Sequence, residues 1–296
     1  MPNRQYEGVI KMRRSLISLG LAAAFVLIWP ATALGSTAPG LGTAATFAIL
    51  AGTPSISNTG ATTVSGSVGI FPGAAVTGFP PGIVTNGTIQ AGTAPANTAQ
   101  TDLTAAYLVA ASSPCNFNKT GQNLGTQTLT PGTYCQTTAP TLTGVLTLSG
   151  NGVFIFQLGS TLVTAPGAQV LFINGAQPCN VFWQVSSSAT LDTTTSFIGT
   201  IMALTDIHLN NGVTLQGRAL ARNGVVTLIN DTITAPTTCN AVTVAGPTGV
   251  VIPGSTGIPD ELMRGQFPWL LVMAIGAGLG AITLGYSSRR RRRRQA

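Results

Sequence analysis

A short pattern recurs along most of the chain and limits what the chain can fold into. Between residues 41 and 240, stretches of four to six residues alternate Thr or Ser with aliphatic or aromatic side chains, and each stretch ends at Gly, Asn-Gly or Pro-Gly. Residues 141–148 and 181–185 are examples. This alternation, rich in β-branched and aromatic residues, predicts short β-strands separated by turns. We therefore expect an all-β fold.

One stretch departs from the pattern. Residues 98–111 contain no Gly or Pro and place apolar side chains at helical spacing, namely at Ala99, Leu103, Ala106, Tyr107 and Ala110. That spacing predicts one long helix whose apolar face packs against a sheet.

Two architectures fit strands this short, a sandwich and a solenoid. The solvent face of a sandwich strand usually carries charged or bulky residues, whereas the alternating positions here are mostly Thr and Ser. Small, uniform side chains favour coils stacked in register, in which like residues form ladders.

The positive net charge of the chain, +7, is concentrated at its ends. Between residues 37 and 257 there are only three cations and four anions, which leaves a net charge of −1. A nucleic-acid-binding domain needs a basic stripe that displaces counterions from phosphates. We therefore expect no nucleic-acid partner.

Residues 1–35 have the layout of a secretory signal peptide. Basic residues precede an apolar run at 16–29, and small residues follow, so that cleavage after Ala33 or Gly35 is expected. Met12 is a possible true start, and an uncleaved anchor is the alternative.

The C-terminal part has the layout of a membrane anchor. Residues 240–266 form a linker rich in Pro, Gly and Thr, and residues 267–286 carry no charge and are long enough to cross ~30 Å of hydrocarbon as a helix. The Arg-rich segment 287–296 would stay in the cytoplasm, which places residues 37–239 outside the cell. Transfer to the cell wall by a sorting system is the alternative, although no Leu-Pro-x-Thr-Gly precedes the span.

All four cysteines fall in the part expected to be exported, where an even number favours two disulfides. Four cysteines allow three pairings. We favour Cys115 with Cys135 and Cys179 with Cys239, because each bond would close one edge of the fold. With no Cys-x-x-Cys and a single His, neither a metal site nor a cofactor is expected.

Several segments carry a resemblance to a known family. They are residues 41–50 (LGTAATFAIL), 70–81 (IFPGAAVTGFPP), 129–134 (LTPGTY), 153–156 (VFIF), 174–176 (NGA), 180–185 (NVFWQV) and 217–223 (GRALARN). Together they resemble the microbial ice-binding proteins of bacteria, fungi and diatoms, in the same order, over about residues 41–235. The resemblance implies a right-handed, discontinuous β-solenoid of triangular cross-section, with the helix along one side. It also implies a monomeric domain that binds an ice crystal through one flat, regular face.

Threonine suits such a face. Ice presents a regular, uncharged array of water oxygens, and Thr offers a hydroxyl, a methyl group and a stiff χ1 angle. Forty Thr lie between residues 37 and 248. The candidate ice-binding residues are Thr59, Thr62, Thr143, Thr147, Thr161, Thr164, Thr190, Asn211, Thr214 and Thr227.

Two other functions compete with ice binding. A polysaccharide-cleaving enzyme would need paired carboxylates or another catalytic cluster. Asp206 and His208 form the only suggestive pair, and Arg218 and Arg222 are expected to pair with acids or to cap turns, so we expect no enzyme. The second alternative is a structural or adhesive module at the cell surface that keeps the fold but binds an envelope or matrix polymer.

Overall fold

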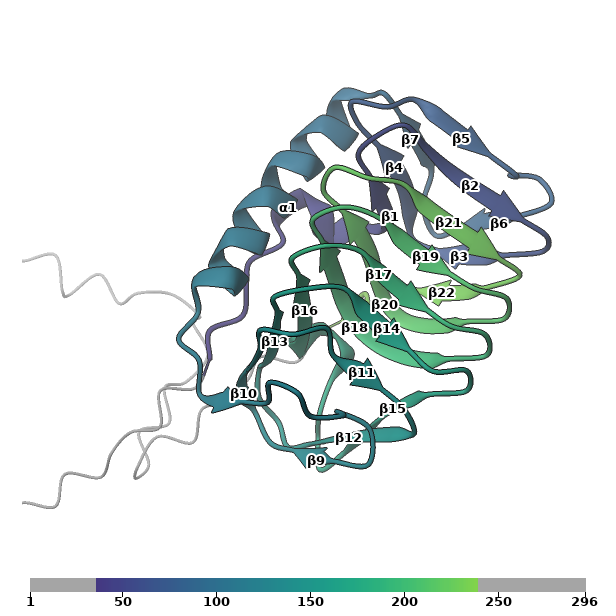
Figure 1. Cartoon of the computed structure of the whole chain (residues 1–296). Coiled ribbons are helices and arrows are strands. Elements are labelled where there is room, and N and C mark those ends of the chain that lie inside the picture. Colours follow the sequence, from purple (N-terminus) through teal and green to yellow (C-terminus); the bar gives the residue numbers. More distant parts are fainter. Residues whose placement is uncertain (1–35, 239–296) are drawn as a thin grey trace, which may run out of the picture. The chain divides into compact units, whose positions relative to one another are not determined.

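The computed structural model describes residues 36–238, which form a stack of short coils of parallel strands with one long helix beside it (Figure 1). The prediction of an all-β, solenoid-like fold with a single long helix is confirmed for these residues. Four predicted segments lie outside the described residues: the signal peptide, the linker, the membrane span and the Arg-rich segment. Within residues 36–238, no helix is both long enough and apolar enough to cross a membrane.

The chain lines three sides of the stack. The side under the helix, here called the helix-covered side, contains in spatial order β8 (Phe117–Asn118), β10 (Gly132–Gln136), β13 (Phe154–Leu158), β16 (Val181–Val185), the second halves of β18 (Ser196–Ala203) and β20 (Thr214–Ala221), β1 (Phe47–Ala51), β4 (Ser67–Ile70) and β7 (Ile89–Ala91).

In the described part of the chain, the other two sides carry no helix. The open side contains β9 (Thr128–Leu129), β12 (Val145–Ser149), β15 (Gln169–Ile173), the first halves of β18 and β20, β22 (Thr232–Thr234), β3 (Thr63–Ser65) and β6 (Ile83–Thr85). The seven-strand sheet contains β11 (Thr141–Leu142), β14 (Leu162–Thr164), β17 (Ala189–Leu191), β19 (Ile207–Leu209), β21 (Val226–Ile229), β2 (Ser55–Thr59) and β5 (Ala75–Thr77).

Strands β18 and β20 are long because each bends around an edge and serves two sides. The bend in β18 lies at Gly199, whose φ of 113° is one that side chains rarely allow. A Cβ atom at this position would also lie 2.8 Å from the side chain of Val181. Only glycine lets the chain turn here without a break in the ladder.

The stack is discontinuous in sequence. The N-terminal strands β1, β2 and β3 pair with β20, β21 and β22, so that Ile49 lies beside Ala219 and Thr63 beside Thr232. The first coils therefore extend the stack from its last coils. Residues at opposite ends of the described chain share the same sheets.

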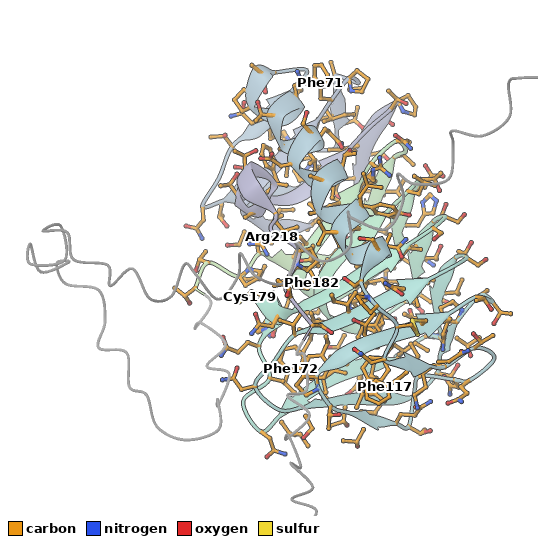
Figure 2. All side chains as sticks on the ribbon, turned by 90° about the vertical axis from the view of Figure 1, so that its left-hand side faces the viewer. Phe71, Phe117, Phe172, Cys179, Phe182 and Arg218 are labelled. Atoms are coloured by element: carbon orange, nitrogen blue, oxygen red, sulfur yellow. A yellow bond between two sulfur atoms is a disulfide. The ribbon has the colours of Figure 1, made fainter. Side chains whose placement is uncertain are left out.

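Aromatic rings form a continuous stack in the interior. The rings of Phe117, Tyr134, Phe156, Trp183 and Phe197 follow one another with centroids 3.9–5.4 Å apart, and the first four stand at the same register on neighbouring strands. The stack begins near one end of the molecule, at the labelled Phe117 in Figure 2, which is partly exposed. Such pairs add to the stabilisation from burial alone.

Helix α1 (Ala94–Ser112) covers one side of the stack, and two 3-10 turns, η1 (Gly42–Thr46) and η2 (Pro178–Asn180), complete the elements. All five predicted apolar positions of the helix are buried. Its predicted bounds, 98–111, were too short, because a proline in the first turn of a helix needs no hydrogen-bond donor and Pro95 is accommodated there. Gln100 ties the helix to the sheet by donating to the carbonyl oxygens of Ala51 and Ala221.

The predicted single strand over 141–148 was wrong. The chain turns at Gly144, with φ of 92°, so that β11 lies in the seven-strand sheet and β12 on the open side. An alternating pattern continues through the turn and hides it in the sequence.

Candidate functional site

The structure distributes the predicted ice-facing residues over four places. The seven-strand sheet and its margins hold Thr59, Thr161, Thr190 and Thr227; the open side holds Thr147 and Thr214; the edge between these two sides holds Thr143 and Asn211; and the interior holds Thr62 and Thr164. The ten candidates therefore do not form one surface.

Two of the candidates are contradicted by their burial. Thr62 is 0% exposed, and its Oγ1 accepts a hydrogen bond from the backbone N–H of Asp231 at 3.0 Å. Thr164 is 1% exposed, and its Oγ1 accepts from the N–H of Asp192 and lies 2.9 Å from Thr195 Oγ1. At an edge of the stack the backbone leaves the ladder, and these inward hydroxyls satisfy its free N–H groups.

A single outward row runs along the middle of the seven-strand sheet. Residues at the same register on successive strands form this central row: Thr141, Val163, Thr190, His208, Thr227, Ser57 and Thr77. All seven are exposed or partly exposed. Since neighbouring strands lie ~4.8 Å apart, the row is roughly 29 Å long.

Sequence reasoning found only part of this row. It selected Thr190 and Thr227 but missed Thr141, Ser57 and Thr77. No local signal marks the missed residues, because Ser57 joins the row only through its pairing with Thr227, which is 170 positions away in the sequence. The strand register of the folded chain is what brings the row together.

The open side is less even. Its corresponding row mixes side chains of different length: Val145, Gln169, Ser196, Thr214, Thr232, Thr63 and Ile83. The turn η2 also packs against β18, where Ile198 is only 8% exposed. Of the two sides without a helix, the seven-strand sheet is therefore the flatter.

No lysine, arginine or carboxylate occupies the central row. Asp192 and Asp206 lie beside it, at the ends of their strands, and both are held by hydrogen bonds. The N–H of Thr193 and the side-chain amide of Asn210 lower the pKa of Asp192. Both groups stabilise the carboxylate in place, so the charge stays at the margin of the sheet.

A short asparagine ladder stiffens the edge between the seven-strand sheet and the open side. Nδ2 of Asn230 donates to Oδ1 of Asn211 at 2.8 Å, and Oδ1 of Asn230 accepts from the N–H of Ala61 at 3.0 Å. Asn230 adopts φ of 52°, a left-handed conformation that asparagine tolerates. The predicted residue Asn211 thus supports an edge of the sheet.

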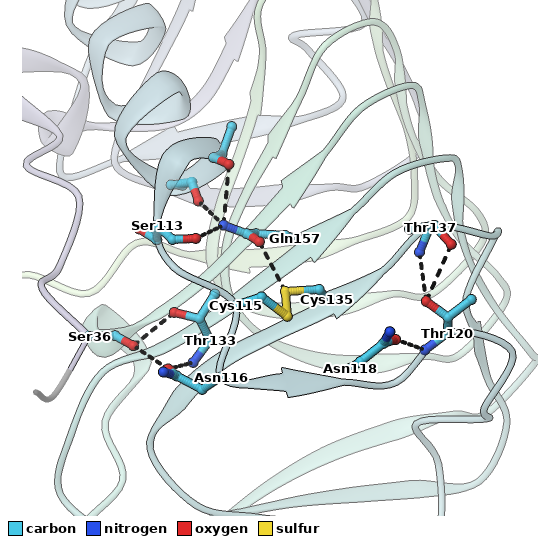
Figure 3. Close-up of a disulfide and its surroundings, with 12 residues drawn as sticks. Ser36, Ser113, Cys115, Asn116, Asn118, Thr120, Thr133, Cys135, Thr137 and Gln157 are labelled. Atoms are coloured by element: carbon cyan, nitrogen blue, oxygen red, sulfur yellow. Dashed lines mark hydrogen bonds between the residues drawn. A yellow bond between two sulfur atoms is a disulfide. The ribbon is translucent and has the colours of Figure 1, made fainter. Parts of the chain in front are cut away.

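The predicted disulfide between Cys115 and Cys135 is present (Figure 3). It ties the segment after helix α1 to β10. Beside it, Nε2 of Gln157 donates to the carbonyl oxygens of Ala110 and Ser113 and so satisfies the end of the helix. Cys239, the predicted partner of Cys179, lies outside the described residues.

Asp206 and His208, the pair that could have suggested a catalytic site, do not hydrogen-bond to each other in the described fold. Oδ1 of Asp206 accepts from the N–H of Val225, whereas Nδ1 of His208 lies 2.8 Å from Thr227 Oγ1. Among residues 36–238, no three His, Cys, Asp or Glu side chains are grouped as metal ligands would be.

One of the two arginines binds a carbonyl oxygen of a turn, η1, as expected, and the other packs over an aromatic ring. Arg218, 5% exposed and labelled in Figure 2, donates to the carbonyl oxygens of Ala45 and Pro236. The guanidinium of Arg222 lies over the ring of Tyr107, 4.7 Å from its centroid, in a cation–π contact. Both side chains stabilise the fold.

Comparisons with known proteins point to one family. An ice-binding protein of Nostoc sp. (strain HG1) is 48% identical over 193 residues, which cover 64% of this chain and 71% of that protein. Another, from Flammulina populicola, is 33% identical over 77% of this chain and 98% of its own length.

Solved structures give the same result. The ice-binding protein from an Antarctic biological consortium superposes with a TM-score of 0.65 at 45% identity, over 68% of this chain and 92% of that one. The ice-binding protein of the Antarctic ascomycete Antarctomyces psychrotrophicus superposes with a TM-score of 0.65 at 34% identity, over 68% of this chain and all of its own. The model of the ice-binding-like family matches residues 49–234. The chain therefore belongs to the ice-binding-like protein family.

Proposed function

We propose that this protein binds ice crystals through the outer surface of its seven-strand sheet, with the central row in the middle of the contact. The observation that carries the proposal is the register of that row, in which Thr, Ser or Val occupies six of seven consecutive strands. Membership of a family whose named relatives are ice-binding proteins supports the same ligand.

The chemistry of the row suits an uncharged crystal of water. A hydroxyl at a fixed position can take the place of a lattice water, and the neighbouring methyl groups favour ordered water between them. β-Branched side chains have few rotamers to lose, so little entropy is lost on adsorption. No lysine, arginine or carboxylate on the row has to be stripped of its hydration shell.

The spacing comes from the backbone. Parallel strands repeat at ~4.8 Å, and the described fold holds this repeat over seven strands whose central row is exposed or partly exposed along its length. The packed hydrophobic core beneath, which includes the inward residues of these strands, keeps the surface rigid. Adsorbed molecules of this kind would slow the growth and recrystallisation of ice.

The experiment compares matched substitutions on two sides of a domain of residues 36–244. A relative is matched over its whole length by 68% of this chain, so a stretch of this size contains the complete fold. Thr190→Tyr and Thr227→Tyr would place a bulky ring in the central row, whereas Thr232→Tyr would place the same ring on the open side.

We expect the wild-type domain and Thr232→Tyr to show thermal hysteresis and to inhibit recrystallisation, and we expect both central-row variants to lose these activities while keeping their melting temperatures. Activity lost only in Thr232→Tyr would move the site to the open side. A folded wild-type domain with no effect on ice would contradict the proposal and favour a non-enzymatic surface module that binds an envelope or matrix polymer.

We further propose that the domain is displayed on the outer side of the cell membrane. The apolar runs at 16–29 and 267–286 support export and anchoring, and the disulfide between Cys115 and Cys135 is consistent with an oxidising compartment. Protease added to intact cells should remove the domain, and the remaining anchor should resist extraction at alkaline pH. A domain released by digestion of the cell wall alone would point to the sorting alternative.

A further inference from the structure

The central row is interrupted at its midpoint by one larger side chain. His208 occupies the fourth of the seven positions, between Thr190 on β17 and Thr227 on β21. The other six positions carry Thr, Ser or Val, whose side chains extend by one heavy atom beyond Cβ. An imidazole ring is several atoms longer, so the surface is not level at this position.

His208 also engages its neighbour. Its Nδ1 lies 2.8 Å from Oγ1 of Thr227, within hydrogen-bonding distance, so the ring leans along the row toward that residue. By contrast, the hydroxyls of Thr141, Thr190 and Ser57 form no hydrogen bond with any other residue of the described fold. Those hydroxyls are available to water, whereas the Thr227 hydroxyl is already paired.

We propose that His208 is the residue that limits the affinity of this face for ice, an inference that rests on the proposed function. The histidine removes two positions from the row. At its own position a ring stands in place of a short hydroxyl side chain, and at Thr227 the hydroxyl is paired with the ring. What remains is a segment of three positions, Thr141 to Thr190, and a segment of two, Ser57 and Thr77. Removal of the ring would join them into one level row.

Charges near the ring do not provide another role for it. Two carboxylates lie at the margin of the sheet: Asp206, whose Oδ1 accepts from the N–H of Val225, and Asp192, whose Oδ1 accepts from Thr193 and Asn210. Both therefore have backbone or amide partners of their own. The polar contact that the fold gives His208 is with Thr227, and a threonine at position 208 would fit the same site with less bulk.

The test is a set of substitutions in the domain of residues 36–244, each checked for its melting temperature. His208→Thr should raise thermal hysteresis at equal concentration by about twofold or more, since it adds one free hydroxyl to the row and releases another. His208→Tyr, which is taller still, should lower it.

A double-mutant cycle separates the two effects of the histidine. Thr227→Val removes only the hydroxyl, so it should change hysteresis little in the wild-type domain, where that hydroxyl is paired, and should lower it clearly in the His208→Thr background. Equal losses in both backgrounds would overturn the inference that His208 withdraws Thr227 from the surface.

Thr190→Tyr distinguishes this inference from the proposed function. Hysteresis abolished by Thr190→Tyr but unchanged or reduced by His208→Thr would leave the ice-binding face in place and overturn the role of His208. Hysteresis unaffected by Thr190→Tyr, or absent from the wild type and from His208→Thr alike, would overturn both.

Discussion

Arg218 holds the last described residues of the chain against the sheet: its Nη2 donates to the carbonyl oxygen of Pro236 at 2.8 Å. Its Nε donates at the same time to Ala45, 173 positions earlier in the sequence. One buried side chain therefore joins the segment that enters the fold to the segment that leaves it. Burial lowers the pKa of this arginine to about 10, so it is still charged at neutral pH and its hydrogen bonds are strong.

Replacement of Arg218 should destabilise the fold without touching the proposed site. Arg218→Met leaves the carbonyl oxygens of Ala45 and Pro236 without their donor, and we expect a loss of about 2–4 kcal/mol in the free energy of unfolding, measured in urea. Arg222→Met is the matched control, because the cation–π contact with Tyr107 is worth about 0.5–1 kcal/mol when partly exposed. Equal effects of the two substitutions would contradict this account of Arg218.

We expect the free energy of unfolding to fall as the pH rises, because of the buried carboxyl group of Asp231. Burial raises its pKa to about 7, against the opposing effect of hydrogen bonds from the N–H groups of Ile229 and Val213. Between the ordinary value of 3.8 and about 7, the folded state therefore holds a proton that the unfolded state has released. Because the folded state binds more protons, the free energy of unfolding decreases across this window.

The measurement is urea unfolding at several pH values from 4 to 7. Hydrogen bonds lower the pKa of Asp102 and Asp192, so these groups add stability as the pH rises to about 5 and leave the range above it to Asp231. Asp231→Asn should be less stable than the wild type at pH 4, since its amide group would face one of the two N–H donors, and its stability should depend much less on pH. A wild-type stability that rises toward pH 7 would rule out the raised pKa.

The disulfide between Cys115 and Cys135 should stabilise the terminal coil. Closing a loop of about 20 residues removes roughly 3 kcal/mol of entropy from the unfolded chain. We expect the double variant Cys115→Ser with Cys135→Ser to unfold at a lower urea concentration and to exchange its amide protons faster in β8 and β10. Ice activity at 0 °C should persist, because neither strand belongs to the seven-strand sheet. Loss of activity in the folded variant would show that the coil and the row are coupled.

Features that depend on residues close together in the sequence could be predicted from it. Features that depend on pairing between distant strands could not. The buried face of α1, with Leu103 and Tyr107, follows from spacing within one helix. The central row depends on register between strands as far apart as β2 and β21, which no local pattern specifies. A shift of one residue moves a side chain to the opposite face, and the short strands, interrupted at edges such as Gly144, allow such shifts at every coil. Thr62 and Thr164 were misplaced for this reason.

The burial of Thr62, which the sequence had placed on the ice-binding surface, can be tested against its neighbour. Thr63 is adjacent in sequence but lies in the opposite environment. Thr62 is fully buried and accepts from the N–H of Asp231, whereas Thr63 is exposed on the open side. A tyrosine at position 62 has no room and should prevent folding. Thr63→Tyr should fold with a melting temperature close to that of the wild type.

A tyrosine at position 62 and a tyrosine in the central row would both abolish ice activity. The first would prevent folding, whereas the second would block the contact with ice. Thr62→Val separates them: it keeps the shape of the side chain, leaves one buried N–H without an acceptor, and should cost about 1–3 kcal/mol in the free energy of unfolding. If Thr62 only supports the fold, the surviving folded Thr62→Val protein has full thermal hysteresis per molecule. A reduced hysteresis in that folded protein would return Thr62 to the ice-binding surface and show that the edge of the sheet opens on contact with ice.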